Sequence, residues 1–193
     1  QIHWVDPNTP IEETLSVLDD LVHQGKVRYI GCSNFKAWQV CEAIWTSRSL
    51  KTTPFISVQP RYNMIDREIE SELITFCSEY GVGILPYSPL AEGFLTGKHR
   101  RGRPAAPDSR LAVNDSGLFT DANFDFLESL ERFSEERGHT VLDLAFAWLL
   151  ACPVVGSVIA GAMNPEQLAA NARAADWQIS PEDLTQLDAI LSS

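Results

Sequence analysis

The sequence predicts a parallel α/β fold with about five strands and helices that cover them. Short apolar segments centred near Ile2, Ile30, Val58 and Leu85 recur every 27 to 28 residues, the length of one strand and one helix. Segments with helical periodicity lie between them. The strand segments are apolar on both faces, which is typical of parallel strands buried between helices.

The first strand is predicted over QIHWV, residues 1–5, and the first helix follows it. Thr9 is expected to cap this helix, with Pro10 at its first position and Glu12 completing a capping box. The apolar residues of this helix fall on one face. Gly25 is expected to end the helix, because glycine readily adopts the left-handed conformation that follows a helix.

The middle of the chain repeats this pattern. Strands are predicted over VRYIGCS, FISVQP and VGILPYS. One helix is expected over about 36–48, between the first two of these strands. Another, capped by Asp66 and ended by Gly81, is expected before the third.

A long loop over about 89–117, rich in Gly, Pro, Arg and Asp, then breaks the rhythm. Loops of this length are usually functional or partly disordered. The loop contains the basic cluster KHRRGR. We interpret this cluster as a solvated loop face, with anion binding as the alternative.

The last part of the chain returns to helices and one strand. Helices are predicted over about 121–137 and over TVLDLAFAWLLA, which is apolar on nearly all sides and must be buried. GSVIAG is the fifth predicted strand. Two further helices are expected to begin at Asn164 and Ser180, each a capping residue followed by proline. Nothing divides the sequence, so a single domain over 1–193 is predicted.

Composition excludes several classes of protein. The net charge is −11, with 26 acidic against 15 basic residues, which argues against a nucleic-acid or anionic-membrane surface. No run of 18 apolar residues and no signal-peptide pattern is present, so a cytoplasmic location is expected. The four cysteines form no CxxC pair and are expected to be reduced thiols, and no metal-binding spacing occurs.

Polar side chains follow the ends of the predicted strands. In parallel α/β folds, ligands bind at the carboxyl ends of the strands. Residues at these positions are His3, Ser33, Asn34, Gln59, Tyr87, Ser88 and Gly161. Amide and hydroxyl side chains can hold a carboxamide, and a tyrosine ring can stack on a flat ring, so a nicotinamide fits this set. Each residue alone also has a structural explanation; Asn34, for example, could cap the following helix.

Four segments carry a resemblance to a known family: GKVRYIGCSNF, SVQPRYNMIDREIE, GILPYSPLAEGFLTGK and VIAGAMNPEQLAAN. In this order and length they resemble the aldo-keto reductases, within them the bacterial and Kv-β-like branch, and the likeness runs along the whole chain. The resemblance implies an eight-stranded (β/α) TIM barrel that binds NADP(H). It also implies that this chain is the C-terminal portion of such a barrel, carrying family strands four to eight.

The resemblance implies a role for each matching residue. His3 matches the catalytic histidine, which orients the substrate carbonyl. Ser33, Asn34 and Gln59 match the carboxamide-holding trio, and Tyr87 matches the aromatic residue that stacks on the nicotinamide. The remaining matches concern the rest of the cofactor: Ser88 and Leu90 for the pyrophosphate, and Gly161, Gln167 and Asn171 for the adenosine end.

The sequence departs from the family pattern in two ways. Between Gly161 and Gln167 no cation is available for a 2′-phosphate, so NADP is expected from the family while NAD is possible, and Arg110 is a candidate to compensate. The family's catalytic Asp, Tyr and Lys have no match in this chain.

The expected activity is the reduction of aldehydes or ketones to alcohols, with this chain inactive alone. The alternative is a non-catalytic nicotinamide-binding or regulatory module. Expected partners are a small carbonyl substrate and, through open barrel edges, a second copy.

Overall fold

The computed structural model describes residues 1–106, 109–113 and 117–192. The chain divides into two compact units, which are treated separately below. Unit 1 consists of Gln1–Arg61, Arg67–Tyr87 and Pro153–Ser157, and unit 2 of Tyr62–Asp66, Ser88–Cys152 and Val158–Ser193. Among the described residues, no helix has the length and apolar character needed to cross a lipid bilayer. The single domain predicted over 1–193 stays a prediction.

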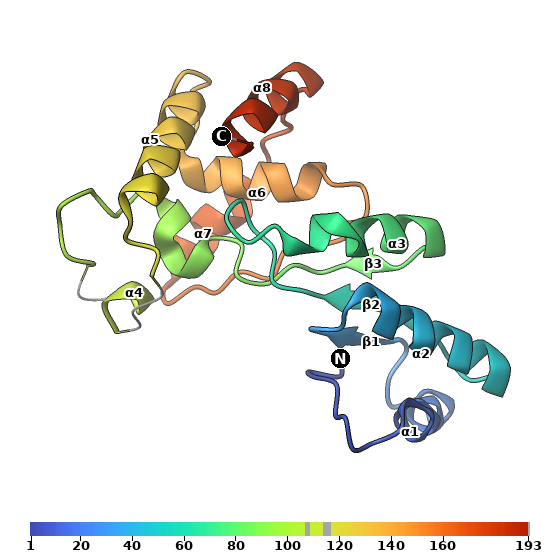
Figure 1. The fold of residues 1–193 in the computed structure, drawn as a ribbon. Helices are drawn as coiled ribbons and strands as arrows, with labels where there is room; N and C mark the ends of the chain where they lie inside the picture. The colour runs from blue at the N-terminus through green and yellow to red at the C-terminus, as the bar shows by residue number, and fades with distance from the viewer. Residues whose placement is uncertain (107–108, 114–116, 193) are drawn as a thin grey trace. The chain divides into compact units, whose positions relative to one another are not determined.

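Unit 1 is built on a small parallel sheet (Figure 1). Its strands are β1 (Ile30–Ser33), β2 (Phe55–Gln59) and β3 (Gly83–Ile84), in that order. Single parallel bridges extend the sheet on both sides, from Ile2 to β1 and from Val155 to β3. The second, third and fourth predicted segments therefore contain the three strands, and the first joins the sheet through one bridge at Ile2. The fifth predicted strand, GSVIAG over 156–161, does not form among the described residues, because the bridge at Val155 lies one residue before it.

Local features explain why neither the first nor the fifth predicted strand forms in full. At Ile2 the peptide exchanges two hydrogen bonds with β1, and a turn held by the Asp6 carboxylate follows within a few residues. At Val155 the pairing is confined between Pro153, which has no N–H to donate, and Gly156, which has no side chain to pack. The prediction of full strands at these two places was wrong.

Three helices accompany the sheet of unit 1: α1 (Ile11–His23), α2 (Ala37–Leu50) and α3 (Leu73–Tyr80), the last preceded by a 3₁₀ turn, η1 (Glu68–Ser71). The predicted capping box of α1 is absent, because the helix begins at Ile11 with Pro10 in the N-cap position, and the Thr9 hydroxyl donates to the Asp6 carboxylate at 2.8 Å. Gly25 follows α1 with φ +69°, as predicted. Asp66 does not cap α3, which begins seven residues later, at Leu73.

Alternation along the strands gives the sheet of unit 1 two different faces. Cys32, Val58 and Ile84 are register partners on neighbouring strands, and all three are fully buried. The helices bury matching apolar residues, namely Leu15, Val40, Ala43 and Cys77. Since side chains alternate along a strand, Ser33 and Gln59, the next register pair, point to the opposite face. The sheet therefore carries its apolar core on one side and its polar strand ends on the other.

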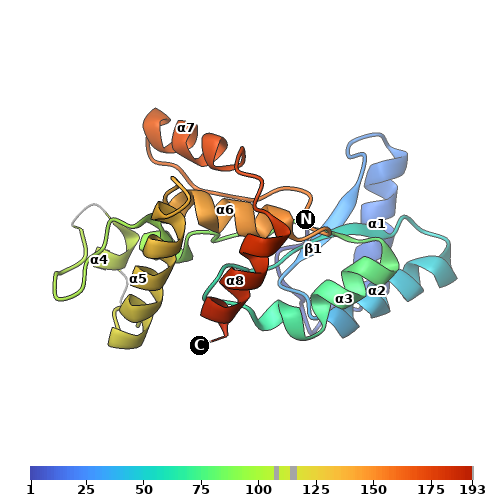
Figure 2. The same ribbon diagram turned by 90° about the horizontal axis from the view of Figure 1, so that it is seen from above.

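Unit 2 is helical. Its elements are η2 (Ala91–Thr96), α4 (Arg110–Val113), α5 (Asp121–Glu135), α6 (Val141–Ala151), α7 (Pro165–Ala174) and α8 (Pro181–Leu191). Helix α6 is its core: it packs against α5 and α7, and Figure 2 shows α7 and α8 on opposite sides of it. Its central residues Leu144 and Leu149 are fully buried, as the apolar sequence predicted.

The helix starts of unit 2 follow the sequence closely. Asn164 and Ser180 accept hydrogen bonds from the backbone N–H three residues on, and each is followed by proline, which confirms both predicted starts. Thr140 and Asp143 form a capping box at α6. The predicted long loop contains η2 and α4, while positions 107–108 and 114–116 of that loop lie outside the described residues.

Candidate functional site

The polar residues at the strand ends of unit 1 form one hydrogen-bonded group, centred on Asn34. The Asn34 amide nitrogen donates to the His3 carbonyl at 3.0 Å and to the Ser33 hydroxyl at 3.2 Å. Its amide oxygen accepts from the Tyr87 hydroxyl at 2.9 Å. Asn34 adopts φ +58°, a left-handed conformation that asparagine tolerates better than most residues. One amide side chain thus links three strand ends that are distant in sequence.

Ser33 and Gln59 complete this group. The Ser33 hydroxyl donates to the Gln59 carbonyl at 2.6 Å, and the Asn34 backbone N–H donates to the same carbonyl at 3.2 Å. Ser33 is buried, whereas Gln59 is half-buried. The Gln59 side-chain amide makes no hydrogen bond to the described residues and is therefore available to a ligand.

His3 and Tyr87 differ in how they are held. The His3 backbone is fixed through its carbonyl by Asn34, but its ring is exposed and lies tilted against Trp4, with ring centroids 5.7 Å apart. Tyr87 is half-buried, and its backbone N–H donates to Pro60 at 2.9 Å. Bonds at both ends of Tyr87, from the backbone and from the hydroxyl, fix the orientation of its ring.

The long segment of unit 2 that begins at Ser88 has an unusual backbone at its start. Ser88, Ala91 and Glu92 all have left-handed φ values, between 45° and 58°, which non-glycine residues rarely adopt. The Leu90 carbonyl accepts hydrogen bonds from both Gly93 and Leu95 and so closes this turn. We call residues 88–96 the strap.

Asn63 holds the start of the strap and was missed by the sequence reasoning. It is fully buried, and its amide nitrogen donates to the Ser88 carbonyl at 3.0 Å and to the Asp66 carboxylate at 2.8 Å. Its amide oxygen accepts from the N–H groups of Ile65 and Asp66. A polar residue in the turn RYNMID, between two predicted elements, was the available signal.

The three residues predicted for the adenosine end lie together in unit 2. The Asn171 amide nitrogen donates to the Gly161 carbonyl at 3.3 Å. The Gln167 side chain accepts from the Met163 N–H at 2.8 Å, across the start of α7. Met163 itself is 88% exposed. Arg110, the candidate cation, lies exposed in α4.

The basic cluster KHRRGR, residues 98–103, is exposed except for His99, which is buried. Arg100 and Arg101 pair with acidic residues of α5. The interpretation as a solvated loop face was therefore wrong only for His99, and anion binding by the cluster stays an untested alternative. The described segments contain no group of three His, Cys, Asp or Glu side chains placed to hold a metal ion.

Comparison with known proteins identifies the family to which this chain belongs. The profile of the aldo/keto reductase family matches residues 1–192. The chain belongs to the aldo/keto reductase family. A solved glycerol dehydrogenase from Gluconobacter oxydans is 30% identical, with a TM-score of 0.84 over 100% of this chain and 57% of its own. The fold is accordingly α/β with parallel strands, of the TIM-barrel superfamily.

Curated members of the family agree with this placement. L-glyceraldehyde 3-phosphate reductase of Escherichia coli K12 is 35% identical, over 96% of this chain and 56% of its own length. A probable voltage-gated potassium channel subunit beta of Oryza sativa subsp. japonica is 34% identical, over 99% of this chain and 60% of its own. The chain thus spans little more than half the length of the family members it matches.

Cys32 lies in β1 directly before Ser33 and is expected to be unreactive in the folded chain. It is fully buried, and burial raises the pKa of its thiol to about 12, with a smaller contribution from Cys77. Because the thiolate is the reactive form, alkylation by iodoacetamide at pH 8 should be slowed roughly 1,000-fold or more relative to an ordinary thiol. Mass spectrometry of the labelled chain measures this, with half-buried Cys41 as the internal control. Modification of Cys32 as fast as Cys41, without denaturant, would contradict the expectation.

Proposed function

We propose that this chain is the cofactor-binding portion of an NAD(P)H-dependent oxidoreductase that reduces aldehydes or ketones to alcohols. It would carry strands four to eight of an eight-stranded barrel. The observation that carries the proposal is the hydrogen-bonded group around Asn34 at the ends of the parallel strands. Family membership supports carbonyl reduction as the chemistry. We assign the protein to the cytoplasm on the sequence expectation.

The strand-end residues of unit 1 fit a nicotinamide. A carboxamide has one N–H₂ donor and one carbonyl acceptor, and the open amide of Gln59 together with Asn34 and Ser33 offers both complementary groups. The Tyr87 ring, fixed by its hydroxyl, offers a flat face for stacking. A bound reduced nicotinamide supplies the hydride for carbonyl reduction.

His3 is proposed to act on the substrate. Its ring is exposed while its backbone is held by Asn34, so the imidazole can approach a substrate carbonyl from a fixed position. An imidazole N–H donated to that oxygen would orient it and stabilise the negative charge that develops there. Replacing His3 should therefore lower kcat of the whole reductase more than it weakens cofactor binding.

The residues proposed for the rest of the cofactor belong to unit 2. Ser88 and Leu90 lie in the strap, and we propose them for the pyrophosphate because left-handed residues such as Ser88 occur in backbone turns that can present N–H groups to an anion. Gly161, Gln167 and Asn171 are proposed for the adenosine end. The family favours NADP, but Glu166 places an acid rather than a cation in the first turn of α7, so NAD is also a candidate.

A second candidate is a non-catalytic nicotinamide-binding or regulatory module. The observation that favours it is the 34% identity to a potassium channel subunit beta, a protein whose name denotes an accessory role. Binding without turnover would separate this candidate from the enzyme. For either function, the proposed partners are small molecules, and self-association through the sheet edges of unit 1 is a further proposal.

Nicotinamide fluorescence tests the proposed function. We expect NADPH titrated into the 193-residue chain to saturate at micromolar concentrations, and a whole reductase containing this chain to oxidise NADPH only when an aldehyde or ketone is added. A parallel titration with NADH, which differs from NADPH only in lacking the 2′-phosphate, decides which of the two nucleotides the chain prefers. Binding without carbonyl-dependent oxidation would favour the regulatory module, and absence of binding to either nucleotide would exclude both.

A further inference from the structure

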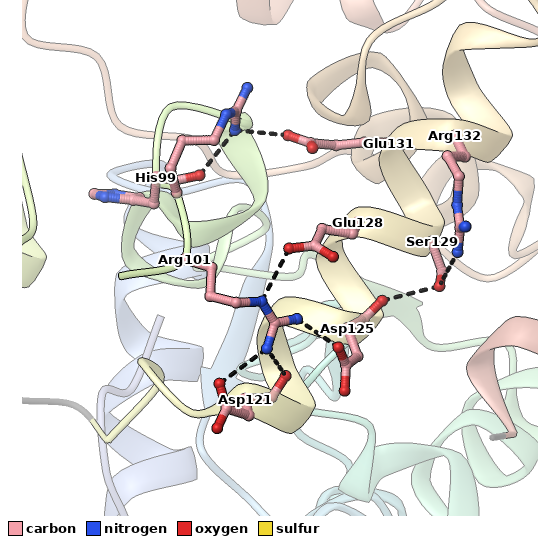
Figure 3. A network of polar contacts seen from close by, with 9 residues as sticks. His99, Arg101, Asp121, Asp125, Glu128, Ser129, Glu131 and Arg132 are labelled. Carbon is pink, nitrogen blue, oxygen red and sulfur yellow. Dashed lines mark hydrogen bonds and ion pairs between the residues drawn. The ribbon is translucent and has the colours of Figure 1, made fainter. Parts of the chain in front are cut away.

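Residues 97–101, which follow the strap, are held against α5 by several ion pairs (Figure 3). All three guanidinium nitrogens of Arg101 are engaged: one contacts Asp121 at 2.9 Å, another contacts Asp125, and the third contacts Glu128 at 3.2 Å. These acids lie four and three positions apart, on one face of α5. We call Arg101 and these three carboxylates the latch.

The charges of the latch favour the position of residues 97–101 against α5. Three carboxylates on one helix face repel one another, and the single guanidinium offsets that repulsion. Hydrogen bonds that Arg101 donates to Glu128, and then to Asp125 and Asp121, hold the pKa of its guanidinium above the usual value. The Arg101 guanidinium also lies 5.8 Å from the Phe124 ring centroid. An uncharged side chain at 101 would leave the three carboxylates without this partner.

A second layer connects the latch to the strap. Arg100 pairs with Glu131 of α5 at 2.9 Å, and it also bonds the Gly97 and His99 carbonyls within its own turn. The buried His99 ring stacks near Phe94 of the strap, and Phe94 contacts Phe124 of α5 with centroids 5.4 Å apart. Displacement of residues 97–101 from α5 would therefore disturb Phe94 and the strap that contains it.

The two layers differ in their sensitivity to salt. The carboxylates of Asp121, Asp125 and Glu128 are 90%, 74% and 51% exposed, so ions in solution screen the latch. The Phe94 contacts are buried and apolar, and salt does not weaken them. Salt therefore acts on the position of the strap mainly through the latch, and to a smaller extent through the Arg100–Glu131 pair, whose carboxylate is only 21% exposed.

We propose that Arg101 is a positioning residue that holds the strap against α5 and thereby sets the rate at which a bound dinucleotide dissociates. This inference rests on the proposed function, because it assigns the strap to the cofactor phosphates. It predicts that dissociation accelerates with ionic strength, and that the larger part of this dependence comes from the three carboxylates that face Arg101.

Three variants of the 193-residue chain test the proposal. Arg101→Gln removes the charge, and Arg101→Lys keeps it but cannot reach all three carboxylates at once. Arg103→Gln is the matched control, because Arg103 lies in the same loop, is exposed and has no ion pair with the described residues. Hydrogen exchange of the amides over 94–101, without cofactor, reports the docking of this segment. Stopped-flow fluorescence reports NADPH dissociation at low and high salt.

We expect Arg101→Gln to accelerate amide exchange over 94–101 and to speed NADPH dissociation roughly tenfold at low salt. Salt should speed dissociation more from the unmodified chain and from Arg103→Gln than from Arg101→Gln, and Arg101→Lys should fall between. NADPH binding with unchanged dissociation in Arg101→Gln would overturn the inference alone. Failure of the unmodified chain to bind either NADPH or NADH would overturn the proposed function, and the inference with it.

Discussion

Replacing Asn34 with alanine is expected to weaken NADPH binding to the chain on the order of 100-fold, or about 3 kcal/mol, since the proposed carboxamide contact is lost and binding must then order the Tyr87 ring and the Ser33 hydroxyl. The Asn34 amide holds the Tyr87 hydroxyl, the Ser33 hydroxyl and the His3 carbonyl at once. Without it, the stacking ring and two polar groups lose their common anchor, and the proposed carboxamide contact is also removed. Fluorescence titration of the variant measures the loss.

Asn34→Gly provides the matched control for this variant. Alanine at φ +58° adds backbone strain to the loss of the side chain, whereas glycine adopts this conformation freely. If the amide is what matters, both variants should lose NADPH affinity to a similar extent, and Asn34→Ala should lose more thermal stability than Asn34→Gly because only alanine adds the backbone strain. Full affinity in Asn34→Gly would show that the side chain does not serve the cofactor.

Replacing Gly31 with alanine is expected to destabilise unit 1 by roughly 3 kcal/mol, the upper end of the cost of overpacking. A methyl group at Gly31 would lie 2.5 Å from the Ser57 backbone carbonyl and 2.4 Å from the Ser57 hydroxyl. The hydroxyl can rotate away, but the carbonyl belongs to the neighbouring strand and cannot. Thermal unfolding, followed by circular dichroism, should show a Tm lower by about 6–12 °C.

Gly83→Ala in β3 is the control for this prediction. Its added methyl group would meet only the Ile56 carbonyl, at 3.7 Å, an ordinary van der Waals contact. This variant should unfold at or slightly above the Tm of the unmodified chain, because alanine has less conformational entropy to lose than glycine. Equal destabilisation by both variants would mean that close strand contact at Gly31 is not the cause.

Local signals in the sequence were sufficient where one short segment decides the structure. Asn164 and Ser180, each followed by proline, begin α7 and α8 as predicted, because the bond that satisfies the helix end comes from three residues away. The same reasoning failed at Thr9, because α1 begins at Ile11 and Pro10 occupies the N-cap position. The Thr9 hydroxyl belongs instead to the preceding turn, where it donates to the Asp6 carboxylate.

Contacts between distant segments could not be predicted in the same way. The strand period of 27 to 28 residues correctly put Ser33, Asn34 and Gln59 at neighbouring strand ends, but the bond between Asn34 and Tyr87 joins positions 53 residues apart. Likewise, the acids at 121, 125 and 128 show helical spacing, yet nothing local pairs them with Arg101. The positions of candidate site residues followed from the sequence, while their partners required the tertiary structure.

The most direct test of the central claim is the NMR signal of the side-chain amides of Asn34 and Gln59 during addition of NADPH. Binding of the nicotinamide carboxamide at these strand ends predicts that both amides shift and saturate together with the fluorescence titration. The amide of Asn8, in the exposed turn before α1, should stay unchanged. NADPH binding that leaves both Asn34 and Gln59 unperturbed would contradict the placement of the nicotinamide at this site.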